Sequence, residues 1–348
     1  MPGPPNTGVR KPQLLGPARE NVGRNSSLFH RRQLSIQALL GWRYFAASCP
    51  SCEQCVGIVG LLRGRIRACD GGSKSPTISD AMAKRSAFWE GKCAIITGAS
   101  SGIGRALAKD LVARGARVGL IARRQEALAE VAREIQAAGG KAECRIADVA
   151  DARSLAMAVG ELKQAIGECD VAIACAGIYR ATHVEPFDPA AMQDVMATNL
   201  LGVCNLFAAV LPGMIGRARG HLAAVASIAG YLGLAQSGAY CASKAAVITL
   251  MQSLRLDLEP KGIGVTTICP GYVDTPMITD EERRTLRGLL TAEDTARRIA
   301  DAIERGKTEV AFPWGLHFQA RGAPLLPWWL YRWLVGSRPV LEEVEKQS

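Results

Sequence analysis

Histidine is scarce in this chain, and none of its histidines stands where a hydrolase or a metal site would need it. The 348 residues include four histidines, namely His30, His183, His221 and His317. None has the neighbours that a serine hydrolase requires. From residue 89 onward, no group of Cys, His, Asp and Glu has metal-ligand spacing. We therefore expect no metal site in this part of the chain and no hydrolase of the Ser–His type.

Excess charge is also missing from most of the chain. The net charge is +10, but residues 1–88 hold 13 Lys or Arg and 4 Asp or Glu, which accounts for +9. The remaining 29 basic and 28 acidic residues leave +1. A body that binds nucleic acid should carry a basic face of its own. We therefore expect no nucleic-acid partner.

Cysteine occurs without the pattern of a disulfide-rich protein. There are 11 cysteines, an odd number, and many lie in apolar runs such as "VAIACAG". Such thiols behave as small buried apolar groups, whereas secreted domains show paired cysteines at regular spacing. The pattern favours a reducing compartment, and we expect a cytoplasmic protein.

Residues 1–88 lack any sustained period of helix or strand and are rich in Pro, Gly, Ser and Arg. We expect a disordered extension, or misassigned upstream sequence with an ordinary start at Met82. "RRQLSIQALLGW" from Arg31 also has the composition of an organellar transit peptide and, less well, of a twin-arginine signal. Cys49, Cys52 and Cys55, with Cys69 beyond, suggest a metal site, although paired ligand spacing is missing. The sequence alone does not decide among these interpretations.

From residue 89 to residue 312, short apolar runs alternate with amphipathic stretches. Strands are expected at 92–97, 116–123, 142–149, 170–177, 221–227, 264–270 and 308–313. Helices are expected at 101–115, 125–140, 151–167, 189–213, 239–260 and 292–305. This alternation predicts an α/β fold, a doubly wound parallel sheet of Rossmann type in a single domain. We expect no second, substrate-binding domain.

A glycine-rich segment, "TGASSGIG", joins the first expected strand to the first helix. Gly98 suits a tight turn, Gly102 lets the backbone approach a pyrophosphate, and Gly104 lets the helix pack on the strand. Ser100, Ser101 and Ile103 complete the loop. A helix N-terminus offers free N–H groups and a positive dipole end to phosphate. The segment therefore predicts a dinucleotide site.

The end of the second expected strand indicates which dinucleotide binds. A site selective for NAD(H) usually has an acidic residue here for the ribose 2′-hydroxyl. This chain has Arg123 and Arg124, and its first acid is Glu126. A guanidinium pairs bidentately with a 2′-phosphate. We therefore predict NADP(H) rather than NAD(H), with Arg123 as the better candidate for the contact.

Three further loops follow expected strands, at the edge where such sheets bind ligands. "ADV" carries Asp148, which can accept from the adenine amino group, with Val149 beside it. "ACAG" carries Ala176 and Gly177, whose small size lets a cofactor lie close. "PGYVDT" supplies a further group, namely Pro270, Gly271, Val273 and Thr275. We expect this last loop to hold the carboxamide, and residues 272–290 to form a mobile cover over the substrate.

A serine, a tyrosine and a lysine carry the predicted chemistry. Tyr240 and Lys244 are four residues apart on one expected helix and share a face. A phenol has a pKa near 10, and we expect the neighbouring ammonium to lower it toward the range that suits general acid–base catalysis. Ser227 ends a strand and can steady charge on a substrate oxygen. Lys244 can also reach ribose hydroxyls of the cofactor.

Together these segments resemble the short-chain dehydrogenase/reductase family. The resemblance covers about residues 92–312 and rests on "TGASSGIG", "ADV", "ACAG", "TNLLG", Ser227, "YCASK" and "PGYVDT". It implies that Asn199 holds a water in a proton relay to Lys244, and that the chain forms a homo-oligomer. One departure is "ACAG", where the family more often has Asn-Asn-Ala-Gly. Ala and Cys cannot make the same side-chain hydrogen bonds, which puts the support of this loop in doubt.

The resemblance implies hydride transfer between nicotinamide and a small-molecule ketone or secondary alcohol. We expect an apolar, lipid- or steroid-like substrate. A non-catalytic dinucleotide sensor on the same fold is an alternative that the complete Ser227, Tyr240, Lys244 and Asn199 set argues against. A dehydratase or epimerase that uses the same tyrosine is a second alternative. The sequence leaves the substrate and the physiological direction open.

The C-terminal segment 313–348 is a separate tail of aromatic and apolar character. "APLLPWWLYRWLV" at residues 323–335 has one charge and is too short to span a bilayer. Trp and Tyr beside Arg suit the membrane–water interface. Peripheral membrane contact through residues 323–335 and packing on the chain's own body or a partner subunit fit the pattern equally well.

Overall fold

The computed structural model describes residues 88–286 and 288–336. The interpretations offered for the N-terminal extension, a targeting signal, a metal site and an upstream start, lie outside the described residues. So do residues 337–348 of the tail.

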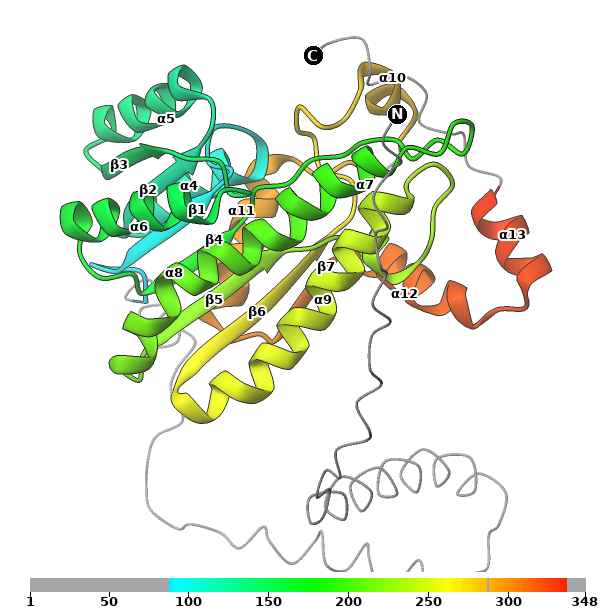
Figure 1. The fold of residues 1–348 in the computed structure, drawn as a ribbon. Coiled ribbons are helices and arrows are strands. Elements are labelled where there is room, and N and C mark those ends of the chain that lie inside the picture. The colour runs from blue at the N-terminus through cyan, green and yellow to red at the C-terminus, as the bar shows by residue number, and fades with distance from the viewer. Residues whose placement is uncertain (1–87, 287, 337–348) are drawn as a thin grey trace, which may run out of the picture. The chain divides into compact units, whose positions relative to one another are not determined.

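Seven parallel strands form one sheet in the order β3-β2-β1-β4-β5-β6-β7 (Figure 1). Their bounds are β1 Cys93–Thr97, β2 Arg117–Ala122, β3 Lys141–Ile146, β4 Val171–Ala174, β5 Gly220–Val225, β6 Ile263–Pro270 and β7 Glu309–Phe312. From β1 the chain adds β2 and β3 on one side of the sheet, and it then crosses to the other side of β1 to add β4, β5, β6 and β7. In an open parallel sheet, ligands bind outside the carboxyl ends of the strands at this switch point.

Helices cover both faces of the sheet, which confirms the predicted doubly wound architecture. One face is covered by α4 (Gly102–Ala113), α5 (Gln125–Ala137) and α11 (Ala292–Glu304). The other is covered by α6 (Ala152–Ile166), α8 (Gly202–Gly216) and α9 (Gly238–Leu258). Successive strand side chains point to opposite faces, so Ile95 packs in one core and Ile96 in the other.

Local capping explains where two of these helices begin. The Asp151 carboxylate accepts from the N–H groups of Arg153 and Ser154, and α6 starts directly after it. The Thr291 hydroxyl accepts from the Asp294 N–H at the start of α11. Each cap satisfies N–H groups that have no partner within their own helix.

The long helix expected at 189–213 is interrupted. α7 (Pro189–Met196) passes through a π-helical segment, η1 (Ala197–Leu201), into α8. A π segment widens the helix locally and is often found at functional sites. Within the described residues, the combined helix Pro189–Gly216 is the one stretch that is long and apolar enough to cross a bilayer. Of the residues in its most apolar 18-residue part, 39% are buried inside the protein. Core helices of soluble proteins pass the same length and composition test.

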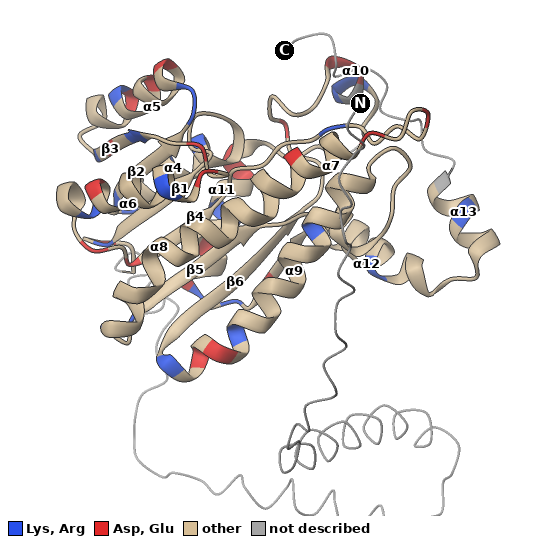
Figure 2. Cartoon of the chain, viewed as in Figure 1, with Lys and Arg blue, Asp and Glu red and all other residues tan. Residues whose placement is uncertain are grey.

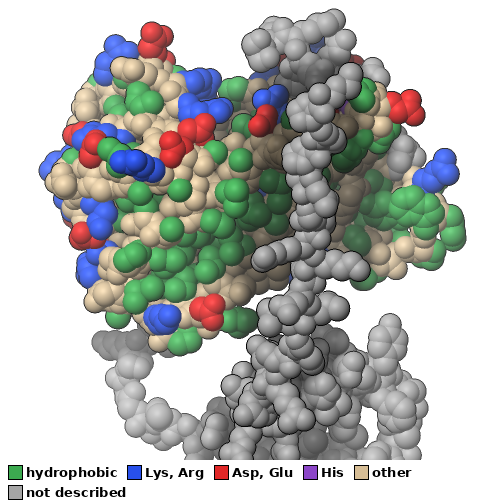
Figure 3. All heavy atoms as spheres, in the orientation of Figure 1, with side chains coloured by type: hydrophobic (Ala, Val, Ile, Leu, Met, Phe, Trp, Pro, Cys, Tyr) green, Lys and Arg blue, Asp and Glu red, His purple; other side chains and the backbone are tan. Residues whose placement is uncertain are grey.

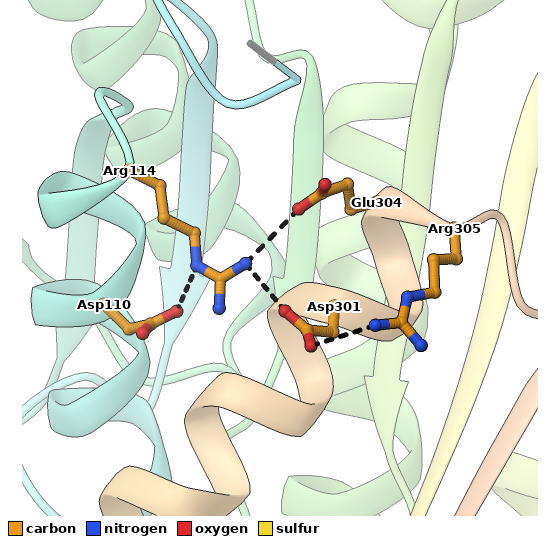
Figure 4. A network of polar contacts seen from close by, with 5 residues as sticks. All are labelled: Asp110, Arg114, Asp301, Glu304 and Arg305. Carbon is orange, nitrogen blue, oxygen red and sulfur yellow. Dashed lines mark hydrogen bonds and ion pairs between the residues drawn. The ribbon is translucent and has the colours of Figure 1, made fainter. Parts of the chain in front are cut away.

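An ion-pair network joins α4 to α11 (Figure 4). Arg114, at the C-terminal end of α4, donates to Asp110 at 2.8 Å and to Asp301 at 2.8 Å. It also donates to Glu304 at 3.3 Å, whose side chain is only 6% exposed. Burial raises the pKa of Asp110, despite the neighbouring guanidinium. The network therefore includes the Glu304 carboxylate, which has little access to solvent.

The described part of the tail folds back onto the body. α12 (Trp314–Gly322), the 3-10 turn η4 (Ala323–Leu325) and α13 (Trp328–Gly336) follow β7. Glu309 accepts from the Tyr231 hydroxyl at 2.8 Å and pairs with Arg321 of α12 at 3.3 Å. Tyr331 of α13 donates to the Gly233 carbonyl at 2.5 Å. Packing on its own body is thus one role of this segment.

Candidate active site

A cavity of about 620 Å³ lies at the carboxyl ends of the strands. It brings together residues from the loops after β1, β2, β3, β4, β5 and β6 and from α9. The predicted site residues that line it are Gly98, Ser100, Ser101, Gly102, Ile103, Gly104, Arg123, Arg124, Asp148, Val149, Ala176, Gly177, Ser227, Tyr240, Lys244, Pro270, Gly271, Val273 and Thr275. Asn199 does not line the cavity, because it is fully buried behind it.

The loop between β1 and α4 is shaped by glycine. Gly98 has φ +69°, and a Cβ there would lie 2.7 Å from the Cα of Ala176 in the loop after β4. A Cβ on Gly104 would collide with the Gly98 carbonyl oxygen, so the first turn of α4 packs closely on the strand end. Ser101 is the N-cap of α4 and makes no side-chain cap hydrogen bond. The first N–H groups of α4 therefore face the cavity without a side-chain cap.

Two arginines lie beside this loop. Arg124 donates to the hydroxyls of Ser100 at 3.1 Å and Ser101 at 2.7 Å. Arg123 lies 3.5 Å from the Asp148 carboxylate, and its side chain is 62% exposed. The sequence argument favoured Arg123 as the phosphate contact. In the structure Arg124 is the one bonded to the glycine loop, and both arginines line the cavity.

The loop after β4 is supported from β1. The hydroxyl of Thr97 accepts from the backbone N–H groups of Cys175 at 3.2 Å and Ala176 at 3.3 Å. This contact supplies support for "ACAG" that its own side chains cannot supply. Sequence reasoning missed Thr97, although a hydroxyl at the last residue of the first strand was a visible signal. In the neighbouring loop, Asp148 accepts from the Ala150 N–H at 2.9 Å.

Tyr240 and Lys244 lie four residues apart on α9, and both line the cavity. The Lys244 ammonium lies 5.6 Å from the centroid of the Tyr240 ring. It donates to the Val225 carbonyl at 2.9 Å. Ser227 begins the 3-10 turn η2 (Ile228–Tyr231), where its hydroxyl accepts from the Ala229 N–H at 3.1 Å. The serine, the phenol and the ammonium are thus collected at one end of the cavity.

The pKa of Tyr240 does not follow the sequence argument. We expected the Lys244 ammonium to lower it, whereas burial raises the pKa of Tyr240 to about 12. A hydrogen bond with Ser227 acts in the lowering direction without overcoming burial. Burial also lowers the pKa of Lys244 to about 8. The ammonium points at the Val225 carbonyl, which explains why its effect on the phenol is weak.

Asn199 lies in the π segment, and its side-chain amide makes three hydrogen bonds. Its Oδ1 accepts from the Ile178 N–H at 2.8 Å, and its Nδ2 donates to the Ile178 carbonyl at 3.0 Å. Nδ2 also donates to the Ser243 hydroxyl at 3.0 Å. A Cβ added to Gly177 would lie 3.4 Å from both Asn199 Oδ1 and Lys244 Nζ, so the two polar atoms flank the same backbone position. Ser243 is a second residue that sequence reasoning missed.

The segment after β6 lies over the glycine loop. A Cβ on Gly102 would approach Thr275 Cγ2 to 2.9 Å. Val273 and Leu290 form a parallel bridge. Arg283 of α10 (Asp280–Thr285) donates to the Asp274 carboxylate at 2.7 Å and to the Thr275 carbonyl at 3.0 Å. The segment thus has the position expected of a cover, and its own contacts hold its two ends together.

The end of the cavity beyond Tyr240 is apolar. Tyr179 lies edge-on to Tyr240 with ring centroids 5.6 Å apart, and its hydroxyl is 3.2 Å from that of Ser237. Other apolar residues line the cavity, namely Ile178, Leu232, Leu234, Met277, Ile278, Leu316, Leu334 and Val335. Residues 88–286 and 288–336 contain no group of three or more His, Cys, Asp or Glu placed to hold a metal ion.

Comparison with known proteins gives a consistent result. Residues 92–285 match the family model described as short chain dehydrogenase. An uncharacterized oxidoreductase of Myxococcus xanthus is 39% identical over 68% of this chain and 93% of its own length. The ketoacyl reductase HetN of a Nostoc species is 34% identical over 63% of this chain and 78% of its own. Among solved structures, an actinorhodin polyketide ketoreductase variant with NADPH superposes with a TM-score of 0.61 at 30% identity, covering 65% of this chain and 97% of that one.

Proposed function

The chain belongs to the short-chain dehydrogenase/reductase family and is therefore an NAD(P)-dependent oxidoreductase acting on CH–OH groups. From this premise we propose that it interconverts a ketone and a secondary alcohol with NADP(H). The substrate that we propose is apolar, of lipid or steroid type. The observation that carries the proposal is the single cavity that has two arginines beside its glycine loop and Ser227, Tyr240 and Lys244 at its apolar end.

The residues of the glycine loop fit a dinucleotide phosphate. Gly98 lies so close to the loop after β4 that a side chain would not fit there, so backbone rather than side chains faces the cavity at this point. The start of α4, which has no side-chain cap, offers N–H donors to the phosphate. Arg123 and Arg124 would hold a 2′-phosphate, which supports NADP(H) over NAD(H). Asp148 and Val149 would contact the adenine. The nicotinamide end would meet Ala176, Gly177, Pro270, Gly271, Val273 and Thr275.

Bound NADP(H) would supply or accept the hydride. The chain itself handles the proton and the charge on the substrate oxygen. Because the pKa of Tyr240 is about 12, its hydroxyl keeps its proton at neutral pH and would donate it to the carbonyl oxygen during reduction. The Ser227 hydroxyl would stabilise charge on the same oxygen.

Asn199 and Lys244 would return a proton to Tyr240. Both polar atoms flank Gly177, and Asn199 Oδ1 keeps a second lone pair after accepting from Ile178. We propose that a water between them links the Lys244 ammonium to solvent. The Ser243 hydroxyl, which accepts from Asn199 Nδ2, would fix the orientation of the amide.

The apolar lining beyond Tyr240 supports an apolar substrate, because burial of apolar surface would be the main source of the substrate's affinity for this part of the cavity. The names of two similar proteins, a ketoacyl reductase and a polyketide ketoreductase with NADPH, support ketone reduction and this cofactor. We propose that residues 89–312 form the catalytic domain and that the tail 313–348 closes its apolar end. Seven free cysteines among the described residues support a cytoplasmic, reducing location.

A homo-oligomer is the partner that the surface supports. The helix α8 contains no charged residue, and apart from the buried Lys244 the charges of α9, Arg255 and Asp257, lie near its C-terminal end (Figure 2). Apolar side chains cover much of this face in Figure 3. Leu201, directly before α8, is 52% exposed, and Leu256 of α9 is 78% exposed. A second copy would bury these side chains from water.

A carbonyl screen tests the proposal. Purified protein is mixed with NADPH and, in separate wells, short ketones, long-chain keto lipids and keto steroids, and absorbance of NADPH is followed. We expect stoichiometric NADPH consumption with an apolar ketone and a matching alcohol product. A product formed without NADPH consumption would indicate dehydration or epimerisation instead. Tight NADPH binding with no turnover of any compound would indicate a sensor.

A further inference from the structure

The helix α13 is apolar on both of its sides. Its sequence WWLYRWLVG carries a single charge, Arg332. At about 100° per residue, its side chains fall on two arcs of about 140° each. The inner arc consists of Leu330, Tyr331, Leu334 and Val335, and the outer arc consists of Trp328, Trp329, Arg332 and Trp333. A helix that is apolar all round is normally covered on all sides.

The inner arc is the less exposed of the two arcs, although Leu334 on it is 39% exposed. Tyr331 donates to the Gly233 carbonyl, and Leu334 and Val335 line the cavity. On the outer arc Trp328 is 72% and Trp329 is 70% exposed. Trp333 and three side chains of α12 and η4, namely Trp314, Phe318 and Leu325, are also more than half exposed. We call the three tryptophans of the outer arc, Trp328, Trp329 and Trp333, the tryptophan surface.

The size of the tryptophan surface is unusual for a monomer facing water. Three tryptophan side chains at about this exposure present on the order of 400 Å² of apolar area. Exposed apolar patches beyond a few hundred Å² mark interaction sites. The side chains of α13 project at the edge of the body in Figure 3. This surface therefore has a partner.

We propose that the tryptophan surface docks in the headgroup region of a lipid bilayer. Tryptophan has an apolar ring and an N–H donor, which is the combination that favours the membrane–water interface. Residues 310–336 contain no Asp or Glu, and Arg332 on the outer arc of α13 complements anionic phosphates. A nine-residue helix is too short to span the bilayer, so α13 lies along its surface.

Docking in this orientation connects the bilayer to the cavity. Leu334 and Val335 of the inner arc line the cavity wall, together with Leu316 and Ala323 of the preceding tail. An apolar ketone dissolved in the bilayer then reaches Tyr240 past α13 without crossing water. This second step rests on the proposed function, whereas the docking itself does not.

The test is co-sedimentation of the full-length protein with vesicles of phosphatidylcholine, and with vesicles that also contain phosphatidylglycerol. The neutral vesicles isolate the tryptophan surface, because the basic residues 1–88 also attract anionic lipid. We expect the protein to sediment with both, and the triple variant W328S/W329S/W333S to lose about tenfold or more of its affinity for neutral vesicles. The control M157S, at a methionine of α6 that is 60% exposed, should bind as the unchanged protein does.

Circular dichroism shows that each variant folds, and reduction of a short water-soluble ketone without vesicles should be equal in all of them. The proposal is overturned if the unchanged protein stays in the supernatant, or if the triple variant binds neutral vesicles equally well. It is also overturned if the triple substitution only dissociates an oligomer, because the surface would then be a contact between protein chains. Vesicle binding without any ketone reduction would reject the proposed function and leave the docking surface standing.

Discussion

The Lys244 ammonium lies 5.6 Å from the centre of the Tyr240 ring while donating its hydrogen bond to the Val225 carbonyl. The lysine is 4% exposed, and its pKa falls to about 8 through burial. The phenol keeps a pKa of about 12. At neutral pH the pair therefore consists of a protonated acid and a cation, which suits proton donation to a ketone.

Replacing Tyr240 by Phe should remove the proton donor and leave the cavity shape unchanged. We expect kcat for ketone reduction to fall by about 100- to 10,000-fold, with the Kd for NADPH changed by less than about threefold. Steady-state kinetics and fluorescence titration of NADPH measure the two quantities. Tyr179→Phe is the matched control, since it removes a hydroxyl from the neighbouring ring and should retain most of kcat. A Tyr240→Phe protein with ordinary turnover would reject the assigned role.

The rate of reduction should fall at alkaline pH. Because burial lowers the pKa of Lys244 to about 8, the ammonium is present below that pH and is lost above it. Tyr240 does not titrate in this range, since its pKa is about 12. We expect kcat/KM for the ketone to be level near pH 7 and to decline above about pH 8, by up to tenfold per pH unit. A profile that stays level to pH 10 would show that the charge of Lys244 is not needed.

Replacing Arg123 by Asp should weaken the preference for NADPH over NADH. The change removes a cation that would meet the 2′-phosphate and introduces repulsion, and charged hydrogen bonds of this kind contribute about 1.5–3 kcal/mol. We expect the ratio of kcat/KM values for the two cofactors to fall by about 10- to 100-fold. Arg124→Ala, which also breaks the bonds to Ser100 and Ser101, should lower the ratio as well. If neither substitution moves the ratio, the 2′-phosphate is held elsewhere.

Removing the guanidinium that joins α4 to α11 should destabilise the fold. Arg114→Met removes the guanidinium that lies 3.3 Å from Glu304, whose side chain is 6% exposed. Breaking one side of a buried ion pair costs about 3–5 kcal/mol, and urea unfolding should show the loss. Arg305, whose side chain is 44% exposed at the rim of the same network, supplies the control. Arg305→Ala should cost less than about 1 kcal/mol, and equal losses for the two variants would contradict this account.

The apolar face of α8 and α9 should control oligomeric state. The double variant L201E/L256E places charge at two exposed positions on this face, and a buried unpaired charge is costly. We expect light scattering to show a homo-oligomer for the unchanged protein and a smaller species for the variant. A mass that is the same in both would place the interface on another surface, or show that the chain is a monomer.

Most of the fold was accessible from the sequence because each strand is a short apolar run and each helix has one apolar face. The spacing of Tyr240 and Lys244 was equally readable, since four residues on a helix always share a face. The π segment around Asn199 was not readable, because no residue type marks an i→i+5 turn. Its presence follows from packing against Ile178 and Ser243, which are distant in sequence.

The direction of the Tyr240 pKa was also beyond sequence reasoning. It depends on how deeply the Tyr240 phenol is buried and on which acceptor the Lys244 ammonium bonds to, and both are properties of the tertiary structure. The tail gave a similar limit. Its composition allowed a membrane contact or packing on the body, and the structure gives α13 one less exposed side, which contacts the body, and one more exposed side.

The hydroxyl of Thr97 holds two amides of the loop after β4, so the path of that loop is set by a neighbouring strand rather than by its own side chains. Directed evolution can therefore vary the residue at position 175 beside the reaction centre while the main chain stays in register. A serine at position 97 would preserve this freedom, and a valine would remove it, because two buried donors would then lack an acceptor. Screening libraries that aim to change substrate choice should begin from this loop and leave Thr97 untouched.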